Sequence, residues 1–153
     1  MPEPISFANA TEQFSFPYLF VGQAQKEFFV NQSLTLIDAL LRGSVASSLS
    51  EPPSEAIDGD VHRVLEPAVG DWLGQDNKLA LRVGRAWHFV APFDGMQLFD
   101  QSAGQLLIFR SGWVSETAPA EVQGGNVVDV EARAAIADLS QSLRSLGILA
   151  PAA

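Results

Sequence analysis

Side chains able to perform covalent or acid–base chemistry are scarce in this 153-residue sequence. Its two histidines, His62 and His88, both lie in strand-like stretches, and the chain contains no cysteine. A catalytic triad needs an activated nucleophile, and no G-x-S-x-G motif is present. No G-x-x-x-x-G-K phosphate loop and no dinucleotide fingerprint occur either. We therefore expect no enzymatic activity and no cofactor, and we interpret both histidines as ordinary strand residues.

The eighteen acidic residues include two groups that could be imagined as sites. Asp58-Gly59-Asp60 could bind calcium, but the further carboxylates of an EF-hand loop are missing. Asp-Gly is also a common turn, so we predict a turn and no metal site. Asp94 and Asp100 could form a glycosidase pair, which needs two carboxyl groups about 5–10 Å apart. Because eighteen acids provide many such pairs, this pair has little specificity. A small hydrolase that acts on polysaccharide is one hypothesis, although no group of catalytic residues supports it.

Two tryptophans, Trp87 and Trp113, follow glycine turns in two similar stretches of sequence. An exposed tryptophan on a sheet can stack on a sugar ring, whereas a buried one gives a small hairpin its core. We favour core packing, because folding alone would produce a repeated position. Glycan contact by these two residues is the alternative.

The composition limits the partners that the protein could bind. Hydrophobic residues make up 47% and charged residues 18% of the chain, against about 25% charged in an average soluble domain. The net charge is −9 and the nine Lys and Arg residues are scattered, so we expect neither nucleic acid nor an anionic membrane as a partner. No apolar run reaches membrane-span length, and we expect no export signal at the N-terminus. The lack of cysteine fits assembly in a reducing cytoplasm.

The first part of the chain predicts an extended arm followed by a helix. Prolines interleaved with aromatic residues over residues 1–22 rule out a regular helix there. Residues 23–43 show helical spacing, and Phe29, Leu36 and Leu40 widen the apolar face. Coiled-coil seam spacing is shown by Val30, Leu34, Ile37 and Leu41. We expect the wide face to pack on two surfaces. One belongs to its own domain, and the other is formed by identical chains around a shared axis.

The rest of the chain predicts an α+β fold. We expect residues 44–59 to form a proline-bearing connector. Residues 60–118 predict a small antiparallel β-hairpin domain with turns at Gly84 and Ser111-Gly112. We interpret Trp72 as the mark of an earlier, more degenerate copy of the hairpin. We expect residues 119–128 to be a loop. Residues 129–149 predict an amphipathic helix capped by Asp129, with a Schellman stop at Gly147-Ile148. The seam of this second helix consists of Ala132, Ile136, Leu139, Leu143 and Leu146. We expect the helices to bundle around a symmetry axis, three-fold in our hypothesis.

Six short motifs occur in an order that resembles a known family. They are "QAQKE", "LIDALL", "EPPSEAIDGD", "GDWLGQDNKLAL", "GRAWHFVAPFDG" and "SGWV". Together, over residues 23–114, they are similar to a domain found in structural proteins of alphaproteobacterial phages, prophages and gene transfer agents, of the head spike or tail fibre type. The closing helix resembles the one that ends many phage-type fibre proteins.

The resemblance implies a virion or phage-like particle component, assembled in the bacterial cytoplasm and without catalysis. It implies a homo-oligomer, with a trimer expected, that contacts other capsid or tail proteins and, in some members, host-surface polysaccharide. The chain departs from the family at Phe28-Phe29, where small residues are common, and has no large receptor-binding module after Val114. These departures favour a spike base, an adaptor or a short fibre. A carbohydrate-binding module that recognises envelope or capsule polysaccharide is the alternative function.

Overall fold

The computed structural model describes residues 18–19, 22, 24–83, 86–120, 123–125 and 128–151. Most of the predicted extended arm and the predicted turn at Gly84 lie outside these residues. The elements, in chain order, are α1 (Lys26–Leu41), β1 (Ser44–Val45), β2 (Ser47–Leu49), β3 (Val61–Val64), the 3-10 helix η1 (Gly70–Trp72), β4 (Leu79–Val83), β5 (Ala86–Val90), β6 (Gln97–Asp100), β7 (Gln105–Phe109), β8 (Trp113–Val114) and α2 (Val130–Ser145). The α+β class is confirmed.

The strands form two mixed four-stranded sheets. One sheet has the order β1-β6-β7-β8 and the other β2-β3-β4-β5. The predicted hairpins are present, since β4 pairs antiparallel with β5, and β7 with β8. In each sheet the first strand pairs in parallel, β1 with β6 and β2 with β3. The predicted purely antiparallel unit is therefore wrong in that respect.

The two parallel strands come from the segment that the sequence indicated as a connector. Ser44–Val45 and Ser47–Leu49 are consecutive pieces of one extended stretch that passes from one sheet to the other. Between them the Ala46 N–H donates to Val61 O at 2.8 Å. Each piece is too short to show alternation, and its partners lie at least fifteen residues away in the register Ser47↔His62 and Ser44↔Phe99. Local periodicity cannot reveal such pairing.

Side-chain alternation gives the β2-β3-β4-β5 sheet two buried faces. Its inner face packs against the other sheet, where the core contains Val45, Val61, Leu79, Leu81, Val90, Met96 and Leu98. Its outer face carries Val64 and Ala80, which pack with the fully buried Trp72. Trp72 lies in η1, so this residue covers a sheet from a loop and does not mark an earlier hairpin copy. The reason is that the loop between β3 and β4 has to cover the outer face.

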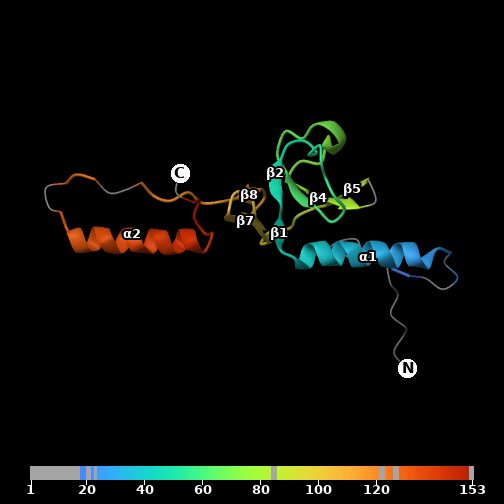
Figure 1. The fold of residues 1–153 in the computed structure, drawn as a ribbon, viewed down its shortest axis with the longest axis horizontal. Coiled ribbons are helices and arrows are strands. Elements are labelled where there is room, and N and C mark those ends of the chain that lie inside the picture. Colours follow the sequence, from blue (N-terminus) through green and yellow to red (C-terminus); the bar gives the residue numbers. More distant parts are fainter. Residues whose placement is uncertain are drawn as a thin grey trace, which may run out of the picture.

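The two helices lie at opposite ends of the molecule. Figure 1 shows α1 beside the sheets and α2 projecting from the far side, both running along the long axis. Within the described part of one chain the helices therefore form no bundle with each other. The end of α2 is attached by hydrogen bonds, because Leu106 N–H donates to Gly147 O (2.6 Å) and Ala150 N–H donates to Glu116 O (3.0 Å).

Local capping sets both ends of α2. The Asp129 carboxylate accepts the Ala132 N–H at 2.8 Å, which confirms the predicted N-cap. At the other end Ile148 N–H donates to Leu143 O (3.0 Å) and Gly147 N–H to Arg144 O (2.9 Å). This pair of bonds, with Gly147 at φ +70°, is the Schellman arrangement that the sequence predicted.

Candidate functional site

The apolar face of α1 divides into two stripes. Leu36, 8% exposed, packs into the core that the two sheets share, with Ala39 and Leu40 partly buried beside it. The predicted seam residues point elsewhere and remain exposed: Val30 (36%), Leu34 (58%), Ile37 (38%) and Leu41 (81%). Successive residues of a helix are separated by about 100° around its axis, so one helix can serve two surfaces. We call these four residues the α1 seam.

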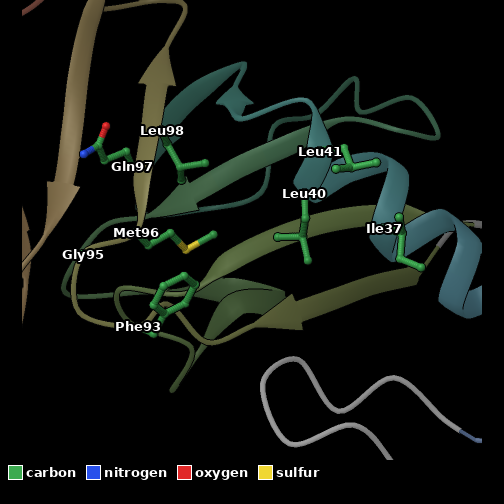
Figure 2. A pocket seen from close by; sticks show the side chains of 8 residues that line it. All are labelled: Ile37, Leu40, Leu41, Phe93, Gly95, Met96, Gln97 and Leu98. Carbon is green, nitrogen blue, oxygen red and sulfur yellow. The ribbon is translucent and has the colours of Figure 1, made fainter.

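A pocket of about 450 Å³ continues the α1 seam onto the β unit. Ile37, Leu40 and Leu41 line one side of it, and the segment from Phe93 to Leu98 lines the other. Figure 2 shows Leu40 facing the same hollow as Met96 and Phe93. Phe93 and Met96 were not among the site residues predicted from the sequence. The signal available was an aromatic residue beside the Asp94-Gly95 turn, where Gly95 has a φ of +92°.

The seam of α2 is exposed along nearly its whole length. Among the described residues α2 buries no side chain, and Leu143 is the one seam residue that is half-buried. Ala132, Ile136, Leu139 and Leu146 are exposed, Leu139 by 61%. Leaving several large apolar side chains in water is costly, and contiguous exposed patches mark interaction sites. The structure places the seams of α1 and α2 apart within one chain.

The two predicted tryptophans take part in packing. Trp87 is half-buried and its ring lies edge-on to Trp72, with centroids 5.1 Å apart, and the Arg82 guanidinium lies 5.2 Å from its centroid. Trp113 is half-buried against the inner core, and its indole N–H donates to Asn77 O at 2.8 Å. Neither ring lies open as a stacking platform.

His62 is buried in an aromatic cluster on the outer face of the β2-β3-β4-β5 sheet. Its ring lies 6.0 Å from Trp72 and 5.9 Å from Trp87, centroid to centroid. Its Nδ1 is 2.9 Å from the Ser47 hydroxyl, whereas its Nε2 has no hydrogen-bond partner among the described residues. Burial lowers the pKa of His62, although the charges of Asp60 and Asp100 oppose this shift. The imidazole is therefore neutral at pH 7.

The carboxylate of Asp100 joins the two sheets. It accepts hydrogen bonds from the Ser48 hydroxyl in the neighbouring sheet, from the Ser102 N–H and hydroxyl (3.0 and 2.9 Å) and from the Ala103 N–H (3.0 Å). Arg63 Nε donates to the same Ser48 hydroxyl at 2.7 Å. Burial by itself raises the pKa of Asp100, but these hydrogen bonds outweigh it and lower the pKa. Asp100 is thus a buried structural carboxylate.

The other acidic candidates form turns. Asp94 accepts the Ser111 N–H at 2.8 Å in an exposed turn. Asp60 accepts the Ile57 N–H at 2.9 Å, and its own N–H donates to Ile57 O at 3.1 Å, which confirms the turn around Gly59. Among the residues that the structure describes, no group of three or more His, Cys, Asp or Glu side chains could hold a metal ion. In the same part of the chain no helix is long and apolar enough to cross a membrane.

Fold and site together define a small α+β domain whose candidate site is an apolar docking surface on α1, continued by a pocket on the β unit. The chain belongs to the DUF2793 family, described as proteins of unknown function, whose match covers residues 30–114 and so more than half of the chain. That range runs from the first α1 seam residue to the last residue of β8, and α2 lies outside it. No curated protein matches the chain.

Proposed function

We propose that this protein is a self-associating structural subunit of a phage-like particle, a gene transfer agent or prophage, as a head spike or tail fibre subunit or its base. It acts there without catalysis, contacts other capsid or tail proteins and assists attachment to the host surface. The phage assignment is supported by the resemblance of the six ordered motifs. The self-association is supported by the two exposed seams.

The single observation that best supports self-association is the division of the apolar face of α1 into a buried and an exposed stripe. Leu36 and Leu40 already supply the contact with the β unit, so the α1 seam has no use inside the described part of the chain. Each apolar side chain that becomes buried between subunits contributes on the order of 1.5–3 kcal/mol. Burial of four such side chains on each subunit favours a closed oligomer and works against the cost of association.

A three-fold assembly also accommodates α2. Both helices run along the long axis of the molecule in Figure 1, so one symmetry axis parallel to it could pass the α1 seam and the α2 seam in turn. Identical subunits around such an axis bury the same patch on every copy. The β unit would then lie outside the helices and face the neighbours of the particle or the host.

The decisive experiment is the solution mass of the purified chain, by light scattering coupled to size exclusion, for the wild type and two variants. We expect a trimer, and we expect Ile37→Asp to dissociate it because the substitution places a charge in the α1 seam. Leu73→Asp is the matched control, since Leu73 is 75% exposed in the loop after η1, outside both seams. A wild-type mass near that of the 16.4 kDa monomer, or an Ile37→Asp variant that stays assembled, would refute the proposal.

A further inference from the structure

The two sheets of the β unit share one strand pattern, but within the described residues only the first has its outer face covered by a loop. In each sheet one parallel pair is followed by two antiparallel pairs, in the orders β2-β3-β4-β5 and β1-β6-β7-β8. The connection between β3 and β4 is long enough to carry η1 and to place Trp72 over the first sheet. The corresponding connection between β6 and β7, residues 101–104, is a tight turn that is too short to cover the second sheet.

The outer face of the β1-β6-β7-β8 sheet is therefore apolar and partly open to water. Paired residues of antiparallel strands lie on the same face, and the pairs Phe99↔Leu106 and Ile108↔Val114 lie on the outer one. Leu106 and Ile108 are half-buried, whereas Phe99 is 37% and Val114 38% exposed. Ile148, which is 40% exposed, borders the same face just after α2. We call these five residues the outer patch.

A hollow of about 240 Å³ in the outer patch has one charge of each sign at its rim. The positive charge belongs to Arg110 and the negative charge to Glu116, and both side chains are exposed. Arg110 lies at the turn between β7 and β8, whereas Glu116 follows β8 and lies at the level of Leu106 in the register of the two strands. Four residues along a strand span roughly 13 Å, so the two charges lie at opposite ends of the hollow.

This arrangement of charges is complementary to itself. A two-fold axis in the plane of the outer patch, perpendicular to β7, would place a second copy face to face with its strands reversed. Arg110 of each copy would then lie opposite Glu116 of the other copy, with the apolar side chains of both patches between the two pairs. Sheets that pack face to face lie about 10 Å apart, a distance that side chains of this length can bridge. Because such a contact is isologous, each ion pair occurs twice.

We propose that the outer patch binds the outer patch of a second copy of this chain, through its apolar side chains and two Arg110–Glu116 ion pairs. The patch is much smaller than the roughly 20–30 residues that each partner contributes to a stable interface. The contact is therefore weak, and it forms at high protein concentration or where a particle holds copies close together. It is separate from the seams of α1 and α2 and does not depend on the proposed function.

Sedimentation equilibrium of the full-length chain, from low micromolar to millimolar concentration, tests this contact. The mass at the lowest concentration reports on the seams, and we expect the mass at the highest concentration to be at least about twice as large. Arg110→Glu and Glu116→Arg should each weaken this association at least about tenfold, because each substitution places two pairs of like charges opposite each other. The double variant Arg110→Glu/Glu116→Arg should restore the association, because both ion pairs form again with their signs exchanged.

Glu55→Arg is the matched control and should associate like the wild type. It makes the same change in charge as Glu116→Arg, at an exposed position outside the outer patch. The double variant keeps the net charge of the wild type, so its recovery would not come from a change in overall repulsion. A mass that does not rise with concentration would overturn the proposal, and so would single variants that associate like the wild type. A double variant that stays dissociated would also overturn it, because Arg110 and Glu116 would then not face each other.

Discussion

Leu36 and Ile37 are consecutive residues of α1, yet they serve different surfaces: Leu36 is 8% exposed in the core between the sheets, and Ile37 is 38% exposed in the α1 seam. The rotation of about 100° per helical residue separates the two roles. Substitutions at these neighbouring positions should therefore be distinguishable, one by its effect on folding and the other by its effect on assembly.

Leu36→Ala should lower the free energy of unfolding by about 2–4 kcal/mol, because it removes a buried side chain and leaves a cavity. Ile37→Ala should lower it by about 1 kcal/mol when unfolding starts from dissociated subunits, because Ile37 is already 38% exposed and loses less buried surface than Leu36. Urea unfolding at low protein concentration measures both values. Equal losses at the two positions would contradict the division of the α1 face.

Asp100→Asn should destabilise the fold by about 2–4 kcal/mol, because a charged acceptor of four hydrogen bonds becomes an amide with a single acceptor oxygen beside the donors of Ser48 and Ser102. Asp94→Asn is the control, since Asp94 accepts one hydrogen bond in an exposed turn, and should cost less than about 1 kcal/mol. Thermal or urea unfolding of the two variants gives the comparison. The prediction fails if the Asp94 variant loses as much as the Asp100 variant.

Stability should fall as the pH decreases through the range below 6.5, because of His62. Burial lowers the pKa of His62 in the folded state, so the unfolded state binds the proton first and protonation favours unfolding. The lowered pKa of Asp100 has its own effect at much more acidic pH, where that carboxylate finally protonates. Unfolding free energies measured between pH 8 and pH 5 should show the loss for the wild type.

His62→Phe should remove that pH dependence between pH 6.5 and pH 5. Phenylalanine still places an aromatic ring in the cluster, but it has no group that binds a proton. His88→Phe is the matched control, since it removes the other histidine of the chain. The prediction is wrong if the pH dependence of the unfolding free energy persists in the His62 variant and disappears in the His88 variant.

Gly147→Ala should destabilise the chain more than Gly43→Ala. Both glycines follow a helix with left-handed backbone, at φ +70° and +62°, so alanine costs about 1–2 kcal/mol of strain at either position. An added Cβ at Gly147 would also lie 2.7 Å from Cε2 of Phe99, whereas nothing lies within 4 Å at Gly43. The difference between the melting temperatures of the two variants measures the effect of the contact with Phe99. Equal shifts would show that the Phe99 ring moves aside without loss of stability.

The sequence by itself determined the elements whose signals are local. The helical spacing from Val30 to Leu41, the cap at Asp129, the stop at Gly147 and the alternating hairpin residues each depend on neighbours within a few positions of the chain. Periodicity also indicated that the face of α1 was too wide for one surface. These features could be predicted because backbone geometry sets periods of 3.6 and 2 residues wherever the chain folds.

The tertiary structure alone decided which residues of those elements are covered. The parallel pairing of Ser44–Leu49 with β3 and β6, the burial of Asp100 and the position of Trp72 over a sheet all join residues distant in sequence. The choice of Leu36 over Ile37 for the core likewise depends on where the sheets lie against α1. Such contacts leave no periodic signal in the sequence, because they form between segments that are far apart along the chain and meet only in the folded structure.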